Sequence, residues 1–501
     1  MRTVVRSRHI FDGISPHLFK GFVEFEGSTI TKVGRDWNHE DPGPDCEVLE
    51  YDECLVMPGL HDNHVFFSGW MAANAGLNLS SADSEEEAAL LLAKEHRENP
   101  TRPIYAHGWN RQLWGQDPER DSLDDISDQT PIVAIDSLRS RYWMNTAAVR
   151  RYGFSEDQLG AEDRALLIKE MTGDRELVRA SWRRFEQLLL ERGVVSCKDI
   201  VFDDTGVHGW LADKRLRADL YIEPVREQVT GARLKQIATQ PLGSKTRLRG
   251  VKLMVDGVVA DGTADIHGRY ASGEPTPQVD YRELEHRVQD IAGSGFSCCM
   301  TAEGDRAIEE SARILSSAAA PGLHHSISDL EMINDRAAGV MAQAGITAEL
   351  YPQILGLNPS AQDAYMPNTI ADDDGSDFFH YSSLTTPGLN LTCGTDCPLF
   401  LPSLPESILR ASLREFDKGG EQWFPQYALP AMAVLSAWTN DGHSNRNDPD
   451  PDSPDASPSL RPGQRATMAI FDRDLVHADA QGLREARVAA TYVDGQPAYE
   501  A

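Results

Sequence analysis

The chain has little basic charge and contains no long apolar run. Its 501 residues include 48 Lys and Arg against 78 Asp and Glu, which gives a formal net charge of -30. Nucleic acids and anionic membrane surfaces are bound through basic patches, so this balance argues against both as partners. Residues 1–10 lack the apolar stretch of a signal peptide, and no later run is long enough to span a bilayer. We therefore expect a cytoplasmic protein.

Cysteine is also scarce. The seven cysteines are odd in number, and no two of them form a Cys-x-x-Cys pair. This spacing argues against a disulfide framework and against a zinc knuckle. Cys298-Cys299 and the pair Cys393 and Cys397 lie in apolar, strand-like segments, which is typical of buried free thiols. A reducing compartment follows from this usage.

The remaining composition is that of an ordinary globular protein. Hydrophobic residues make up 41% of the chain and charged residues 25%, which is ample material for a core. The length allows about three average domains, or one large barrel with a smaller unit.

The two ends of the chain carry strand patterns. Residues 1–56 contain short alternating segments with tight turns, such as 21–27 and 29–34, which predict antiparallel strands. Residues 466–495 return to this pattern and end in an Asp494-Gly495 turn. We therefore predict one small β unit made of residues 1–56 and 426–501, with a mobile, Pro- and Asp-rich loop at 445–458.

Residues 57–425 have a different texture, because apolar strand candidates alternate with amphipathic helices. Helices are expected at 84–97, 174–192 and, after residue 427, at 430–439. The strand candidates are Pro131–Ile135, Gly193–Cys197, Val251–Met254, Ser297–Met300, Thr347–Leu350 and Leu389–Cys393. Strands separated by helical patterns predict parallel βα units.

The segment Met57–Phe67 is the most informative one. A short apolar strand ends at Pro58-Gly59, and polar side chains follow. Residues at the C-terminal ends of barrel strands face the open end where chemistry occurs. A His-x-His pair there would place two imidazoles on one side of the strand, as a metal clamp. Here His64 is present, but Phe66 occupies the second position.

Further motifs are spread along the chain. They are Ala106-His-Gly-Trp109-Asn with Asp121-Ser-Leu-Asp-Asp125, Gly250-Val-Lys252-Leu-Met-Val-Asp256-Gly257, Glu303-Gly-Asp-Arg-Ala-Ile308 and Cys393-Gly-Thr-Asp396-Cys-Pro398. With the segment around His64, they make the chain resemble the amidohydrolase superfamily, and within it amidohydrolase family 3, also called YtcJ-like. The resemblance runs nearly end to end.

The resemblance implies a fold and a chemistry. The fold is an α/β (β/α)8 TIM barrel with a small β-sandwich formed from both chain termini. Family members use one or two divalent metals to activate water against an amide-type C–N bond. By resemblance, His64, Lys252 and Asp396 would be the metal ligands, Lys252 could be carbamylated, and Asp396 would accept the proton of the attacking water.

The chain departs from the family pattern at four histidine positions. Phe66, Ser140, Thr301 and Asp329 stand where the family has histidine. Zinc prefers imidazole and thiolate ligands, and a catalytic site usually needs three protein ligands. An oxygen-rich, ligand-poor pocket suits manganese or magnesium better. We expect one divalent ion (Zn, Mn or Mg) or none, and without a metal Lys252 with a lowered pKa could be a base.

Several candidates have a structural alternative. Lys252 could form a salt bridge with Asp396 or Asp329. Glu303 is expected to face the pocket as a catalytic residue, whereas Asp305 could cap a helix at 306–319. Asp329 either stands in the place of a metal ligand and contacts the substrate, or caps a helix starting at Leu330.

Trp109 and Asn145 complete the expected substrate contacts. Trp109 would wall the pocket, although a Trp in such a loop often only packs. The functional prediction is hydrolysis of a non-peptide C–N bond in a small molecule, with Asp396, Lys252 and Glu303 as catalytic residues. Two alternatives remain: a metal-independent lyase or isomerase using Lys252 and carboxylates, and an inactive barrel that binds a small ligand. If the protein assembles, a homodimer is the commonest arrangement.

Overall fold

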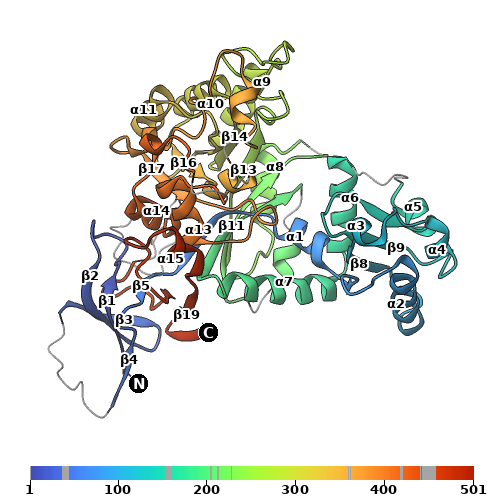
Figure 1. The fold of residues 1–501 in the computed structure, drawn as a ribbon, viewed down its shortest axis with the longest axis horizontal. Helices are drawn as coiled ribbons and strands as arrows, with labels where there is room; N and C mark the ends of the chain where they lie inside the picture. Colours follow the sequence, from blue (N-terminus) through green and yellow to red (C-terminus); the bar gives the residue numbers. More distant parts are fainter. Residues whose placement is uncertain are drawn as a thin grey trace.

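The computed structural model describes residues 2–36, 45–153, 160–203, 206–211, 214–226, 228–358, 360, 363–417, 421–440, 442 and 459–501. Its centre is an eight-stranded parallel sheet (Figure 1). In order around the sheet, the strands are β6 (Leu60–Val65), β11 (Val194–Phe202), β12 (Arg217–Glu223), β13 (Thr246–Met254), β14 (Ser297–Ala302), β15 (Ser326–Asp329), β16 (Thr347–Leu350) and β17 (Asn390–Cys393).

The sheet closes into a barrel where its first and last strands meet. Val65 and Cys397 form a parallel bridge, and the Phe66 N–H donates to the Cys397 carbonyl at 2.7 Å. Gly394 permits this approach, because a Cβ there would lie 2.8 Å from the His64 nitrogen. The open end at which the strands finish is called the barrel mouth below. The predicted barrel fold is confirmed.

Helices cover the outside of the barrel and bury one apolar face. In α10, for example, Ala307, Ile308, Ala312 and Leu315 recur at helical spacing and are fully buried. The covering helices are α1 (Phe67–Asn74), α7 (Arg175–Leu190), α8 (Gly231–Ala238), α9 (Tyr281–Gly293), α10 (Asp305–Ser317), α11 (Asp335–Ala344), α13 (Leu404–Ile408) and α14 (Ala431–Trp438). The helices expected at 174–192, 306–319 and 430–439 are confirmed to within two residues.

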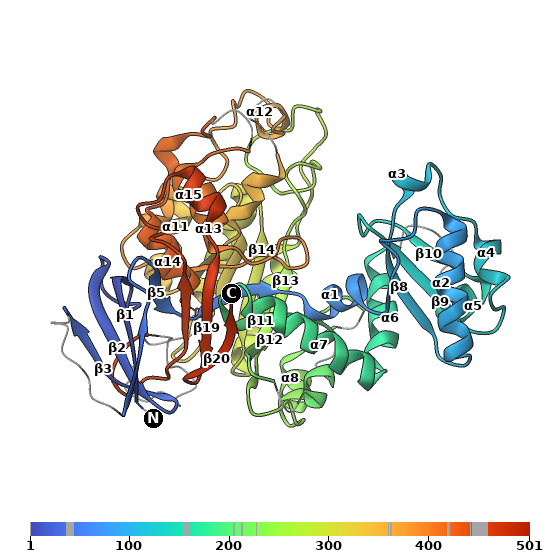
Figure 2. The same ribbon diagram turned by 60° about the horizontal axis from the view of Figure 1, so that its bottom comes forward.

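The two ends of the chain form one sheet, as predicted. Its order is β20-β19-β18-β5-β1-β2-β3, with β4 paired to β1, and Figure 2 shows the blue and red strands side by side. The strands are β1 (Arg2–Ile10), β2 (Phe19–Glu26), β3 (Thr29–Arg35), β4 (Cys46–Glu50), β5 (Leu55–Pro58), β18 (Met468–Phe471), β19 (Val488–Val493) and β20 (Gln496–Glu500). Val23, Phe25, Met468 and Tyr492 share its core. The loop expected at 445–458 lies outside the described residues.

A separate α/β lobe is inserted between β6 and β11. It comprises residues 77–152, called the insert below, and Figure 2 shows it beside the barrel. Its sheet consists of β7 (Leu77–Asn78), β8 (Ile104–Trp109), β9 (Ile132–Asp136) and β10 (Tyr142–Met144), with the helices α2 (Glu85–Glu98), α3 (Arg111–Trp114), α4 (Arg120–Asp124) and α5 (Thr146–Tyr152). The helix expected at 84–97 is therefore α2. The strand expected at Pro131–Ile135 forms, but it belongs to this sheet and not to the barrel, and the range 57–425 encloses the insert.

The insert also touches the barrel mouth. The Arg139 guanidinium donates a hydrogen bond of 2.5 Å to the carbonyl of Pro398, which follows strand β17. α6 (Ala161–Thr172) leads from the insert back to α7. Within the ranges given above, no helix is long and apolar enough to cross a membrane.

Candidate active site

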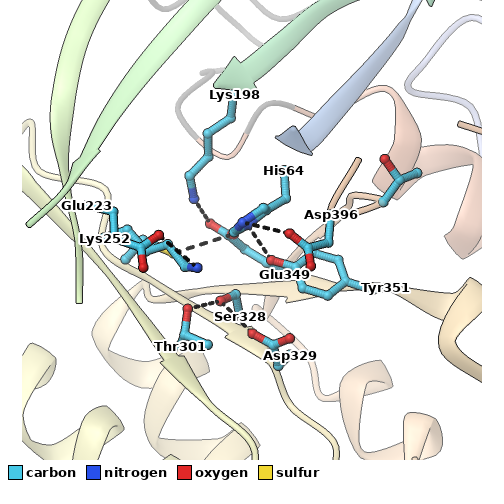
Figure 3. Close-up of polar contacts among 12 residues, drawn as sticks. His64, Lys198, Glu223, Lys252, Thr301, Ser328, Asp329, Glu349, Tyr351 and Asp396 are labelled. Carbon is cyan, nitrogen blue, oxygen red and sulfur yellow. Dashed lines mark hydrogen bonds and ion pairs between the residues drawn. The ribbon is translucent and has the colours of Figure 1, made fainter. Parts of the chain in front are cut away.

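Three residues singled out in the sequence converge at the barrel mouth. His64 lies on β6, Lys252 on β13, and Asp396 in the loop that follows β17 (Figure 3). His64 Nε2 lies 3.5 Å from Asp396 Oδ1. The charge of Lys252 acts on both neighbours, because it opposes protonation of His64 and stabilises the carboxylate of Asp396. The predicted convergence of these three side chains is therefore present in the fold.

His64 is held as a neutral imidazole. It is 2% exposed, and the Tyr351 hydroxyl lies 2.5 Å from its Nδ1. Burial, followed by the charges of Lys252 and Lys198, keeps the pKa of His64 well below its usual value. A carboxylate beside Nε2 favours the proton on that nitrogen, which leaves Nδ1 to accept from Tyr351. The imidazole thus presents an N–H toward Asp396.

Asp396 is partly open to solvent. Its side chain is 43% exposed, and its backbone has a φ of 50°, which is uncommon for a residue other than glycine. Although water reaches it through the mouth, desolvation by the surrounding protein raises the pKa of Asp396 to about 7; Lys252 opposes this shift, and Asp329 and Glu223 add to it. The group can therefore exchange a proton near neutral pH.

Lys252 is held as a cation by a residue that the sequence did not single out. Its Nζ lies 3.3 Å from Glu223 Oε2, at the end of β12. Burial alone would lower the pKa of Lys252, but the charges of Glu223, Asp396 and Asp329 outweigh it and raise the pKa. The expected salt bridge to Asp396 or Asp329 is replaced by the pair with Glu223. The expectation of a lowered pKa is wrong.

A second ammonium group lies deeper in the barrel. Lys198 on β11 forms a 2.5 Å ion pair with Glu349 on β16, and both side chains are at most 2% exposed. Lys198 also lies 4.3 Å from the ring centroid of Tyr221. The sequence analysis missed Lys198, Glu349 and Glu223. The sequence feature that could have identified them is a charged residue within an otherwise apolar strand, such as Lys198 within Val194–Phe202.

Thr301 on β14 and Asp329 on β15, two of the positions that depart from the family pattern, belong to a small hydrogen-bonded cluster with Ser328. Thr301 Oγ1 and Ser328 Oγ are 2.9 Å apart, and Ser328 Oγ donates to Asp329 Oδ2 at 3.1 Å. Burial raises the pKa of Asp329 to about 6, although Lys252 opposes the shift. Asp329 does not cap a helix at Leu330, because α11 begins at Asp335 with Asn334 as its N-cap.

Glu303 lies beside this group, in a carboxyl pair of its own. Its Oε2 accepts a 2.8 Å hydrogen bond from the Val259 N–H. Burial, and then the charges of Glu331 and Asp329, raise the pKa of Glu303, and burial raises that of Glu331. The Tyr365 hydroxyl donates to Glu331. The next acidic residue, Asp305, is the first residue of α10 and does not cap it, because the N-cap is Gly304; its carboxylate lies in the first turn, where a negative charge is favourable.

Trp109 and Asn145 do not line the barrel mouth. Trp109 is 1% exposed in the core of the insert, where its indole donates to the Ala134 carbonyl and stacks on Trp114. Asn145 caps α5 by accepting from the Ala148 N–H, accepts from the Ile132 N–H, and donates to two carbonyls. Both side chains are fully used inside the insert. Their expected role in substrate binding is therefore corrected to a structural one.

The donors at the mouth do not fit a resident divalent metal. A catalytic metal site usually has three protein ligands and a water. Among the residues that the structure describes, no three His, Cys, Asp or Glu side chains are grouped to hold an ion. The Phe66 ring packs on Phe202 with centroids 4.4 Å apart, and the Lys252 nitrogen is paired as an ammonium. His64 and Asp396 remain as two neighbouring donors.

Several solved structures share the fold. Two crystal structures of uncharacterized metal-dependent hydrolases, from Pyrococcus horikoshii and Pyrococcus furiosus, match with TM-scores of 0.73 and 0.72, each at 17% identity. The alignments cover 96% and 95% of this chain and 99% and 100% of theirs. Guanine deaminase from C. acetobutylicum with bound guanine matches with a TM-score of 0.53 at 9% identity, covering 100% of both chains. At such identities the likeness shows the fold alone.

The sequence itself places the chain in a family. No curated protein sequence matches it significantly. The sequence model of the amidohydrolase family, however, matches residues 51–499, which include the barrel, the insert and the strands β5, β18 and β19 of the terminal sheet. The chain therefore belongs to the amidohydrolase family.

Proposed function

We propose that this protein hydrolyses an amide-type, non-peptide C–N bond in a small molecule at the barrel mouth. Family membership supports the reaction class. The observation that carries the proposal is the convergence of three groups: the partly open Asp396 carboxylate lies 3.5 Å from His64 Nε2 and near the Lys252 ammonium. A base, an orienting imidazole and a fixed cation at one point suit the attack of water on a polarised carbon.

Each group has a distinct role in the proposed reaction. Asp396 accepts a proton from water as its oxygen bonds to the substrate carbon. The ammonium of Lys252 donates a hydrogen bond to the oxyanion that develops. When the C–N bond breaks, Asp396 returns the proton to the leaving nitrogen. His64 holds the Asp396 carboxylate in place through its Nε2–H, and Tyr351 fixes the orientation of the imidazole.

The alternative in which Lys252 is the base receives less support. A lysine base must release its proton, and the ion pair with Glu223 stabilises the protonated form instead. A lyase or isomerase that depends on a neutral Lys252 is therefore disfavoured by the geometry.

The test is the variant Asp396→Asn, assayed with a panel of small amides, lactams and amino-heterocycles. The substitution keeps the shape and removes the base, so turnover of any wild-type substrate should fall by about 100-fold or more. Asp372→Asn, which changes an 89% exposed carboxylate, is the matched control and should retain activity.

Two results contradict the proposal. One is an Asp396→Asn variant that is as active as the wild type. The other is a wild-type protein that turns over no member of the panel although panel members raise its melting temperature. The second result would instead favour an inactive barrel that binds a small ligand.

A further inference from the structure

We infer that lysine ammonium groups take the place of a divalent metal in this barrel, so that the reaction centre works without a resident metal and Lys252 carries no carbamate. The role of Lys252 toward the substrate rests on the proposed function. The metal content and the state of Lys252 do not, and they are tested without turnover.

The first step of the argument concerns the positions where metal donors would be needed. Phe66 presents an apolar ring that packs against Phe202, with centroids 4.4 Å apart. Thr301 is 6% exposed, and its hydroxyl is engaged with that of Ser328 at 2.9 Å. The position directly after β6 therefore has no donor atom, and one on β14 has a neutral hydroxyl already in use. Neither can complete a site begun by His64.

The second step concerns the carboxylates. Glu349 is paired with Lys198 at 2.5 Å, and Glu223 is paired with Lys252 at 3.3 Å. Each of these two carboxylates is thus paired with an ammonium group and is not available as a metal ligand. A divalent ion beside His64 would also lie near two ammonium charges in a poorly solvated space, where repulsion between cations is strong. The pairs replace metal coordination as the source of positive charge.

The third step concerns Lys252 itself. A carbamate on its Nζ would replace a cation by an anion at ion-pair distance from Glu223. The carboxylates of Asp396 and Asp329 also act on this nitrogen. A carbamate on Lys252 would therefore be repelled by all three carboxylates, because no metal ion would lie between the negative charges. The unmodified ammonium fits this surrounding, and it is the form that can donate to an oxyanion.

The first experiment measures metal content. Wild-type protein is produced in medium supplemented with zinc and manganese, purified without chelators, and analysed by mass spectrometry for bound metals. The expected result is a small fraction of one ion per chain, with an unchanged melting temperature after dialysis against EDTA. Close to one ion per chain in the wild type, lost in His64→Ala, would overturn the inference.

The second experiment restores the missing donors. The variant Phe66→His with Thr301→His and Asp329→His should bind zinc about 100-fold more tightly than the wild type, because it gains three imidazoles around His64. Phe202→His places an imidazole near the same ring and is the matched control, which should gain little. If the triple variant does not fold, Phe66→His alone creates the His-x-His pair and should show the same direction. Wild-type protein that binds zinc as tightly as the variant contradicts the inference.

The third experiment examines Lys252. The wild type is incubated with ¹³C-labelled bicarbonate, and its carbon NMR spectrum is compared with that of Lys252→Met. No carbamate resonance is expected in either protein. A resonance that appears in the wild type and is missing in Lys252→Met would overturn the inference, whatever the outcome of the search for a substrate.

Discussion

The hydroxyl oxygen of Tyr351 lies 2.5 Å from Nδ1 of His64, with the two rings edge to face at 75°. The contact joins the end of β16 to β6 at the barrel mouth. The Asp396 carboxylate beside Nε2 favours the proton on that nitrogen, so Nδ1 accepts from the Tyr351 hydroxyl. The phenol of Tyr351 therefore fixes the direction of the imidazole beside the proposed base.

Replacing Tyr351 by Phe should lower kcat and leave KM nearly unchanged. The ring still packs on His64, but the hydrogen bond that fixes the imidazole is lost, so kcat should fall about 10-fold or more. Steady-state kinetics on a substrate from the panel measures the effect. Tyr499→Phe, on the remote strand β20, is the control. An unchanged kcat in Tyr351→Phe would show that the contact does not position His64.

Replacing Lys198 by Met should destabilise the fold strongly. Glu349 would remain 2% exposed without its ammonium, and removal of one partner of a buried pair costs about 3–5 kcal/mol. The double variant Lys198→Met with Glu349→Leu removes both charges and should recover most of that loss. The free energy of unfolding from chemical denaturation measures both variants. A single variant as stable as the wild type contradicts the assigned role of the pair.

Replacing Asn145 by Ala should weaken the insert without affecting the substrate. The side chain caps α5 and binds four backbone groups, so its loss should cost about 1–2 kcal/mol or more. Thermal unfolding followed by tryptophan fluorescence measures the effect, because three of the nine tryptophans, Trp109, Trp114 and Trp143, lie in the insert. A large rise in KM with unchanged stability would instead support a role of Asn145 in substrate binding.

The carboxyl pair of Glu303 and Glu331 should make the fold less stable as pH rises. Burial raises both pKa values above the ordinary value of 4.5, and the charge of Glu331 adds to the shift of Glu303. A raised folded-state pKa means that the folded form keeps protons which the unfolded chain has already lost. The contribution to stability is therefore complete below pH 4.5 and declines as pH rises above it.

The variant Glu303→Gln tests this pH dependence. Gln has no proton to lose. The unfolding free energy of the variant should therefore fall less between about pH 5 and about pH 8, the interval above the ordinary carboxyl pKa, than that of the wild type. Glu274→Gln, at an exposed position, is the control. Parallel pH profiles for Glu303→Gln and the wild type would contradict the shared titration of the pair.

Most barrel strands were predictable because they are buried on both faces and read as apolar runs. The expected segments Val251–Met254, Ser297–Met300 and Thr347–Leu350 lie within β13, β14 and β16. β12 escaped notice because Arg217 and Asp219 interrupt its apolar residues. Asp219 is 1% exposed and pairs with Arg249 on the neighbouring strand at 3.0 Å, and the sequence does not show that partner.

The insert shows a second limit of prediction from the sequence. Ile132–Asp136 has the same local pattern as a barrel strand, since any strand buried in a parallel sheet favours apolar, β-branched residues. Local pattern does not say which sheet a strand joins. The same reason explains Trp109 and Asn145, whose motifs were recognised while their burial inside a separate lobe was not.

The sequence by itself determined the family through its motifs, and the resemblance to that family implied the closed barrel with its terminal sheet and the three side chains that meet at the mouth, because strand-end motifs are local properties of the chain. Only the tertiary structure decided how these side chains are charged. Glu349 is 151 residues from Lys198 and Tyr351 is 287 residues from His64 in the chain, whereas Glu223 pairs with Lys252 across the neighbouring strands β12 and β13. The protonation of a buried group depends on such neighbours, and closure of the barrel is what brings them together.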